Sequence, residues 1–189
     1  MNYKKYQNVR DVVWKILIKE NITALPIKTG SLCKSLGIVV KYYVPDDDND
    51  GYCTLINDMP YIFINKNCVR SRKRFTIAHE LGHLLLGHVG KYNLVNREPS
   101  PSDNPIEHEA NVFASRLLAP ACVLWGCKVK TADEIVALCD ISREAAEFRM
   151  NRMEELYKRN KFLTSPLERQ VYAQFNNFIK CHHPYQQDF

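Results

Sequence analysis

The chain has 189 residues, of which 46% are hydrophobic and 25% are charged. These fractions are ordinary for a soluble globular protein, and they exclude wholesale disorder, a collagen-like repeat and a membrane-spanning protein. The length suits one domain with a substantial core, whereas two full domains would be cramped. A net charge of +5 is too modest to indicate nucleic-acid binding by itself.

The first 24 residues predict an amphipathic helix. Lys15 interrupts the apolar run from Val12 to Ile18, and no small-residue cleavage site follows it, so we expect no signal peptide. The seven cysteines are scattered and form no CxxC pair. This distribution is typical of thiols in a reducing compartment, and not of a disulfide framework or a cysteine-based zinc site. The sequence therefore predicts a cytoplasmic protein.

Three segments downstream are rich in β-branched and aromatic residues and predict strands. They run from residue 37 or 38 to 44, from 51 to 56 and from 60 to 65. Asn57 and Asp58 predict a tight turn between the last two. A short helix is expected before the strands, around residues 31–36. We expect the strands to form a small antiparallel sheet.

The rest of the chain has a mainly helical pattern. Three helix starts are marked by a cap residue followed three positions later by a glutamate: Asn104 with Glu107, Thr131 with Glu134, and Ser165 with Glu168. The segment 165–180 predicts a capped, amphipathic C-terminal helix. The expected fold class is therefore α+β, mainly helical with one small sheet.

The stretch RFTIAHELGHLLLGH, from Arg74 to His88, contains an HExxH motif. On a helix His79 and His83 are about 40° apart around the axis, so both imidazoles project from one face and can hold one zinc ion. Glu80 lies about 100° from His79, close enough to reach a water on the metal. The surrounding residues are apolar, and burying these polar groups without a compensating partner would be costly. A metal is that partner, and the motif predicts a zincin-like domain in which the sheet precedes this helix.

A catalytic zinc site usually takes three protein ligands and keeps one position open, so a third ligand is needed. His88 is a poor candidate, because on a continuing helix it would point away, about 140° around the axis from His83. The long HExxHxxGxxH motif is also excluded, since Leu86 and Val89 occupy the positions of its glycine and its third histidine. The third ligand is therefore expected on another element.

The next acidic helix offers Glu107 and Glu109, which flank its apolar face on opposite sides, while His108 points away from that face. Periodicity does not choose between the two glutamates. Glu107 occupies the third helical position after the cap residue Asn104 and has a structural role there, whereas Glu109 has no such role. We therefore predict Glu109 as the third ligand and keep Glu107 in reserve.

The HExxH stretch, followed by EANVFASRLLAP, resembles the ImmA/IrrE family of metallopeptidases. The resemblance covers roughly residues 25–156. It divides the chain into an N-terminal helix (1–24), a zinc metallopeptidase domain (25–156), and a C-terminal helix and tail (157–189) packed on the same domain. We find no helix-turn-helix or sensor segment of the kind that some family members carry.

The resemblance also implies a site and a function. Zinc, or manganese in its place, would be held by His79, His83 and Glu109, with Glu80 as the catalytic glutamate. The family implies a cytoplasmic peptidase that cleaves a helix-turn-helix transcriptional repressor of a phage or mobile element. In such a site zinc makes a water acidic enough for Glu80 to act as the general base of peptide hydrolysis.

An alternative function is a non-cleaving, zinc-bearing regulatory module that binds the repressor or DNA. Glu80 favours the enzyme, because a purely structural zinc site needs no general base. Candidates for stabilising the oxyanion are Tyr92, Arg116, His182 and His183, all of which also suit surface or structural roles.

Four of the five residues from Arg70 to Arg74 are cationic. Cations in the first turn of a helix are unfavourable by about a few tenths of a kcal/mol each, so we expect the helix to begin earlier, at residue 65 or 67, or the run to serve a partner. A solvated helix face explains the run most simply, and an acidic stretch of a protein substrate is the next explanation. No DNA-binding module accompanies the run, so we expect no direct nucleic-acid binding.

Overall fold

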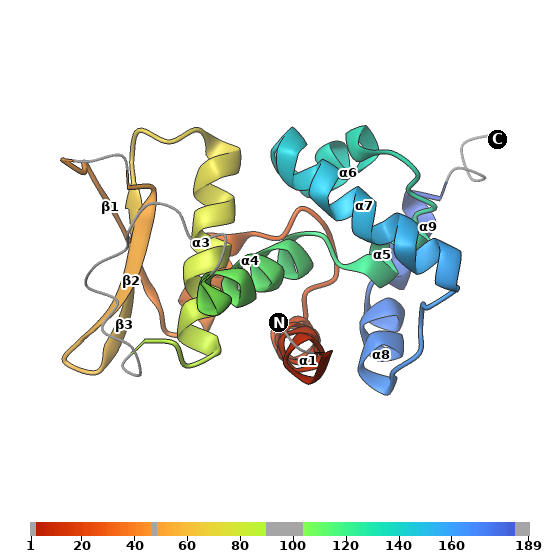
Figure 1. The fold of residues 1–189 in the computed structure, drawn as a ribbon, viewed down its shortest axis with the longest axis horizontal. Helices are drawn as coiled ribbons and strands as arrows, with labels where there is room; N and C mark the ends of the chain where they lie inside the picture. The colour runs from red at the N-terminus through yellow and green to blue at the C-terminus, as the bar shows by residue number, and fades with distance from the viewer. Residues whose placement is uncertain (1–2, 47–48, 90–103, 184–189) are drawn as a thin grey trace. The chain divides into compact units, whose positions relative to one another are not determined.

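A computed structural model describes residues 3–46, 49–89 and 104–183. Its residues group into two compact units: Met1–Val12 with Lys28–Ala114, and Val13–Ile27 with Ser115–Phe189. The chain passes from one unit to the other within helix α1 (Tyr3–Lys19), after Ile27, and within helix α4 (Pro105–Leu118) (Figure 1). The domain boundaries expected near residues 24 and 156 remain predictions.

The first unit contains a three-stranded sheet of β1 (Val39–Tyr43), β2 (Gly51–Ile56) and β3 (Met59–Asn65), in the order β1-β3-β2. Strands β2 and β3 form the predicted hairpin. Asn57 and Asp58 have positive φ angles of 50° and 61°, which a tight two-residue turn requires. Within the described residues, the α+β class and the three strands are confirmed.

The sheet is mixed, whereas the sequence predicted an antiparallel one. Strand β1 pairs with β3 in parallel, with Val39 opposite Tyr61. The hairpin partner β2 occupies one edge of β3, so β1 joins at the other edge. Because β2 reverses the chain after β1 and the hairpin turn reverses it again, β1 and β3 run in the same direction.

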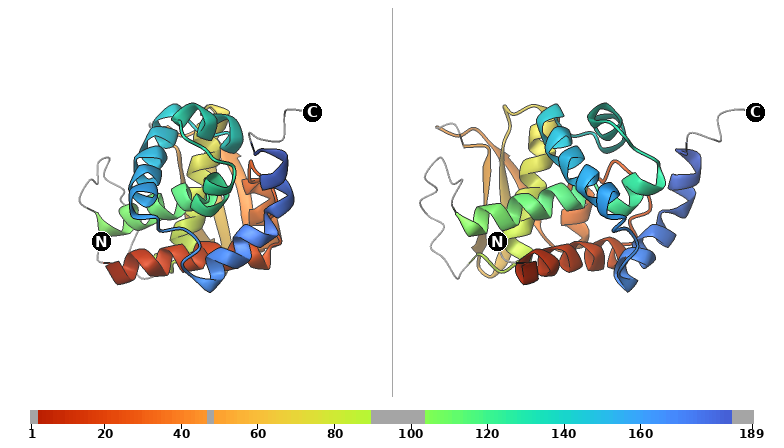
Figure 2. Two further views of the ribbon diagram at one scale, coloured as in Figure 1. Left: turned by 90° about the vertical axis from the view of Figure 1, so that its right-hand side faces the viewer. Right: turned by 45° about the vertical axis from the view of Figure 1, so that its right-hand side comes forward.

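Helix α3 (Arg70–Leu85) carries the HExxH motif and packs against one face of the sheet, where it contacts β2 and β3 (Figures 1 and 2). Helix α2 (Thr29–Ser35) contacts both β1 and α3. The sheet and α3 bury apolar side chains that are at most 3% exposed: Ile62, Ile64, Ile77, Ala78 and Leu81. Burial of this apolar area holds the motif helix in a fixed position on the sheet.

The basic run lies in the first turns of α3. The helix begins at Arg70, so the prediction of an earlier start at residue 65 or 67 is wrong. Arg72 forms an ion pair with Asp50, which offsets part of the unfavourable placement of a cation near the helix start. Arg74 is buried, so at least part of the run belongs to the fold.

The second unit is helical in its described residues. Besides parts of α1 and α4 it contains α5 (Ala121–Gly126), α6 (Ala132–Cys139), α7 (Arg143–Arg159), α8 (Pro166–Gln174) and α9 (Asn176–Cys181). All three predicted helix starts along the chain are confirmed, with side-chain caps from Asn104, Thr131 and Ser165. No helix of the described residues has the length and apolar character needed to cross a bilayer.

The predicted C-terminal helix is divided in two, since α8 ends at Gln174 and α9 begins at Asn176. The Gln174 side-chain amide donates to the carbonyls of Leu17 and Ile22, at 2.7 Å each. Phe175, between the two helices, is fully buried. The C-terminal helices therefore form part of the core of the second unit.

Candidate metal centre

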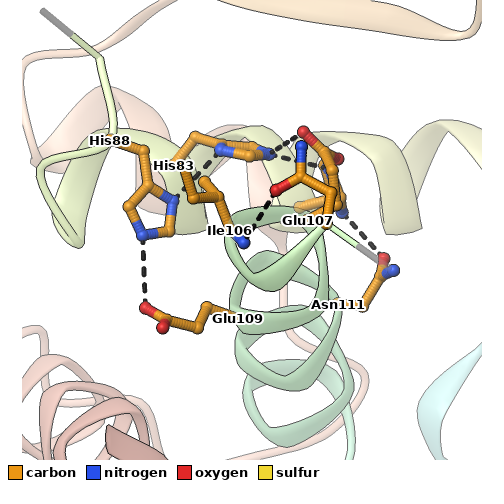
Figure 3. A network of polar contacts seen from close by, with 8 residues as sticks. His83, His88, Ile106, Glu107, Glu109 and Asn111 are labelled. Atoms are coloured by element: carbon orange, nitrogen blue, oxygen red, sulfur yellow. Dashed lines mark hydrogen bonds and ion pairs between the residues drawn. The ribbon is translucent and has the colours of Figure 1, made fainter. Parts of the chain in front are cut away.

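Three side chains from α3 and α4 converge within the first unit (Figure 3). His79 and His83 lie one turn apart on α3, and their Nε2 atoms are 3.0 Å from each other. The two oxygens of Glu107, near the start of α4, lie 3.0 Å from His79 Nε2 and 3.4 Å from His83 Nε2. The side chain of His83 is fully buried, and those of His79 and Glu107 are 12% exposed. The cluster is thus largely shielded from water.

Asn111 fixes the orientation of the His79 ring. Its Oδ1 atom lies 2.9 Å from His79 Nδ1, the ring nitrogen that does not face the cluster. Because an amide oxygen only accepts hydrogen bonds, Nδ1 carries the proton and Nε2 presents its lone pair to the cluster. This is the form of imidazole that binds a metal, and a hydrogen-bonded partner behind the ring is the usual companion of a histidine ligand.

The cluster fits a metal ion. Ligands about 2.0–2.2 Å from a tetrahedral metal lie about 3.3–3.6 Å from one another. The two Nε2 atoms are 3.0 Å apart, and the Glu107 oxygens lie 3.0 and 3.4 Å from them, close to that range. At such distances the lone pairs of two imidazoles and a carboxylate repel one another unless a proton or a metal cation lies between them. The two nitrogens and one oxygen therefore lie close enough together to hold one metal ion.

The charge of Glu107 supports the same conclusion. In the metal-free protein, burial raises the pKa of this carboxyl, but hydrogen bonds and charge from His79 and His83, protonated on Nε2 in that state, outweigh burial and hold the pKa well below its usual range. Glu107 is therefore ionised at neutral pH. An ionised carboxylate beside two imidazoles supplies the negative charge that a divalent cation requires.

Close packing of α3 on α4 sets the distance between the histidines and Glu107. A Cβ atom added at Gly82 would lie 3.0 Å from Cδ1 of Phe113, a fully buried residue of α4. The missing side chain at position 82 thus lets the two helices approach each other. This contact lies one residue before His83 and connects the packing of the helices to the geometry of the cluster.

We predict that Gly82→Val lowers the free energy of unfolding by about 1–3 kcal/mol, because the added side chain overpacks the contact with Phe113. It should also weaken zinc binding by separating α3 from α4. Chemical denaturation of the metal-free protein and a zinc titration measure the two effects. Gly30→Ala is the control, since a Cβ atom at Gly30 meets nothing within 4 Å. Unchanged stability and zinc affinity in Gly82→Val would contradict the role of this contact.

Glu80, the predicted catalytic glutamate, is the residue after His79 on α3 and is 1% exposed. The helix places it about 100° from His79 and about 60° from His83 around the axis. Glu80 is therefore a carboxyl group held in the interior beside the histidine pair, and not a solvated surface group.

The structure does not bring Glu109, the predicted third ligand, to the histidine pair. Its carboxylate lies 3.4 Å from His88 Nε2 (Figure 3). The other carboxylate oxygen lies 3.2 Å from Lys5 Nζ. The carboxylate beside the pair is that of Glu107, the reserve candidate predicted from the sequence. The geometry thus favours the reserve residue.

The capping pattern explains why sequence reasoning preferred the other glutamate. Asn104 caps α4 through the Ile106 N–H, at 3.0 Å, and the Glu107 side chain points to the histidines. A second signal was present in the sequence, because Glu107 and Asn111 are four residues apart and project from one face of the helix. With this spacing, Glu107 can bind the metal while Asn111 forms a hydrogen bond with the ligand His79.

His88 lies behind His83, because α3 ends before it. Gly87 has a positive φ of 71°, and the N–H groups of Gly87 and His88 bond to the carbonyls of Leu84 and His83, at 3.2 and 2.9 Å. This is the Schellman pattern of helix termination, and it turns the chain back toward the helix. The Nδ1 atoms of His88 and His83 are consequently 3.1 Å apart. His88 therefore contacts Nδ1 of His83, the nitrogen of the His83 ring that does not face the cluster.

The surroundings of His88 favour its neutral form. Burial, followed by the charge of His83, lowers the pKa of His88, while the hydrogen bond and charge of Glu109 act in the opposite direction. A neutral imidazole accepts a hydrogen bond at one ring nitrogen and donates at the other, which suits a residue placed between two partners.

The candidates for stabilising the oxyanion have different surroundings. Tyr92 lies outside the described residues. Arg116 is buried on α4, and His182 is exposed after α9, where its Nδ1 donates to the Phe178 carbonyl at 2.8 Å. His183, next along the chain, is partly exposed. The oxyanion role of all four remains a prediction.

The sheet, the motif helix and the carboxylate from the next helix define a metallopeptidase-type domain. The chain belongs to the peptidase family whose model is described as the IrrE N-terminal-like domain, and the match covers residues 33–151, more than half of the chain. The resemblance stated from the paired motifs is thereby confirmed. A comparison with curated proteins gives no match.

Proposed function

We propose that this protein is a zinc-dependent endopeptidase. Its metal ligands are His79, His83 and Glu107. Its general base is Glu80, which follows the first ligand on α3. The proposal is carried by the convergence of two imidazoles and one carboxylate, whose ligand atoms all lie within 4.8 Å of one another. Membership of a peptidase family supports the same class of reaction.

Zinc is the metal that this donor set favours. Two histidines and one glutamate form one of the usual ligand sets of catalytic zinc, in which a fourth position stays open. Manganese, the substitute we retain, prefers sites richer in oxygen. The chemistry that zinc supplies when bound is Lewis acidity, which makes a water at the site more acidic and polarises the peptide carbonyl.

Glu80 moves the proton in the proposed reaction. Its carboxylate takes a proton from the water whose oxygen adds to the carbonyl carbon of the substrate. Glu80 then gives this proton to the nitrogen of the leaving amine as the C–N bond breaks. Because Glu80 is 1% exposed, bulk water screens its charge only weakly, which strengthens its electrostatic interactions with the reacting groups.

The proposed substrate is a helix-turn-helix transcriptional repressor of a phage or mobile element, cleaved in the cytoplasm. The support for this substrate is the resemblance of the HExxH stretch and of EANVFASRLLAP to the ImmA/IrrE family. The exposed cations at the start of α3 offer a contact for an acidic stretch of such a partner.

Repressor cleavage should require the metal. The purified protein is incubated with a helix-turn-helix repressor, with zinc or manganese in one reaction and with a chelator in the other. We expect fragments only in the metal-loaded reaction, and their return when zinc is restored to the chelated sample. Equal cleavage in chelator contradicts the proposal. Binding without cleavage by the metal-loaded protein favours the alternative, a non-cleaving zinc-bearing regulatory module.

A further inference from the structure

A chain of polar contacts leads from His83 away from the cluster (Figure 3). His83 Nδ1 lies 3.1 Å from His88 Nδ1, and His88 Nε2 lies 3.4 Å from a carboxylate oxygen of Glu109. The other oxygen of Glu109 lies 3.2 Å from the ammonium group of Lys5, on α1. All four residues belong to the first unit. These side-chain contacts connect His83, a proposed ligand, to the N-terminal helix α1.

One arrangement of protons satisfies every contact in this chain. If His83 binds the metal through Nε2, its proton is on Nδ1 and is donated to His88 Nδ1. His88 then has its own proton on Nε2 and donates it to Glu109. The ammonium group of Lys5 donates to the remaining oxygen of that carboxylate.

We infer that His88 and Glu109 are positioning residues for His83. They hold its ring in the orientation and the tautomer that a metal ligand needs. Lys5 anchors the outer end of the chain through Glu109. The inference rests on the proposed function, since it concerns the same metal site, and it gives Glu109 a role other than that of a ligand.

Burial decides which link matters most. The His83 side chain is 0% exposed and that of His88 is 7% exposed. Removing His88 Nδ1, the acceptor for His83, therefore leaves a buried N–H group of His83 without a partner. The Glu109 side chain is 13% exposed and that of Lys5 is 60% exposed, so water can replace their contacts more readily. The effect of substitution should therefore decrease outward along the chain, from His88 to Lys5.

The decisive variant is His88→Phe, which keeps a ring and removes both nitrogens. We expect zinc affinity, measured by competition with a chromophoric chelator, to fall about 10- to 100-fold, the usual effect of removing a partner behind a histidine ligand. The matched control is His108→Phe, at an exposed position on α4, which should bind zinc like the wild type. Thermal unfolding of the metal-free forms shows whether each variant folds.

A second readout separates positioning from a general packing role. His88→Asn restores an acceptor for His83 near the position of Nδ1, so it should recover most of the zinc affinity. In proton NMR of the zinc-loaded protein, the Nδ1 proton of His83 should exchange slowly in the wild type and in His88→Asn. The same resonance should broaden or disappear in His88→Phe, because its acceptor is gone.

The outcomes distinguish this inference from the proposed function. Wild-type zinc affinity and a slowly exchanging His83 proton in His88→Phe would overturn the positioning role and leave the zinc peptidase intact. Failure of the wild type to bind zinc would instead overturn the proposed function. Loss of zinc in Glu109→Gln, with retention in Glu107→Gln, would make Glu109 a ligand and overturn the positioning chain as well.

Discussion

Glu107→Gln is expected to lose the metal. The substitution keeps the size of the side chain but removes the negative charge that lies 3.0 and 3.4 Å from the two histidine nitrogens. Removing a residue that hydrogen-bonds to a metal ligand usually lowers metal affinity about 10- to 100-fold, and removing the ligand Glu107 itself should lower zinc affinity more. Competition with a chelator measures the affinity, and elemental analysis of the purified variant measures the metal content. Cleavage should disappear with the metal.

Glu109→Gln is the matched control, since it makes the same change two residues later on the same helix. Its amide oxygen can still accept from His88, so we expect zinc affinity to fall by about tenfold at most. The opposite result, with zinc lost in Glu109→Gln and retained in Glu107→Gln, would restore the ligand predicted from the sequence and refute the one proposed from the geometry.

Glu80→Gln is expected to abolish cleavage while the metal stays bound. Glutamine occupies almost the same space but does not take a proton from water, so the rate should fall by about 10²- to 10⁴-fold. A time course of repressor cleavage gives the rate, and a zinc titration confirms that the site is intact. Because Glu80 is not a proposed ligand, zinc affinity should be close to that of the wild type.

The alternative function predicts a different pattern for the same variant. A regulatory module that only binds the repressor would behave identically with glutamate or glutamine at position 80. Repressor fragments that form at equal rates in the wild type and in Glu80→Gln would rule out Glu80 as the general base. Repressor affinity, measured separately, should be unchanged in the variant, so that a loss of cleavage is not attributed to lost binding.

Local features of the fold were predictable from the sequence. The hairpin of β2 and β3 was predicted because Asn57 and Asp58 tolerate the positive φ angles of the turn. The helix starts were predicted because each cap bonds to an N–H group only two or three residues away. The parallel pairing of β1 with β3 was missed, since it depends on strand order, which local patterns do not specify.

The site was predictable where it depends on one helix and less so where it depends on two. The spacing of His79 and His83 is enough to place both imidazoles on one face. The choice between Glu107 and Glu109 depends on how α4 is rotated against α3, where Phe113 of α4 packs on Gly82 of α3. Capping, a local rule, favoured Glu109, and tertiary packing brought Glu107 to the histidines.

The position of His88 was also not predictable from helix periodicity alone. Its predicted direction assumed a helix that continues past Leu85, whereas Gly87 ends the helix with a positive φ. A glycine directly after a run of leucines is itself a signal of helix termination, and it indicates that the next side chain can fold back on the last turn. The prediction that His88 lies outside the ligand set agrees with its place behind His83.

Anomalous diffraction at the zinc absorption edge, from crystals of the zinc-loaded protein, tests the proposed ligand set most directly. We expect one strong peak beside α3, about 2.0–2.2 Å from Nε2 of His79, Nε2 of His83 and a carboxylate oxygen of Glu107. Glu109 should remain in contact with His88. Absence of a peak between the two histidines, or a peak whose third ligand is Glu109, would rule out the proposed metal centre.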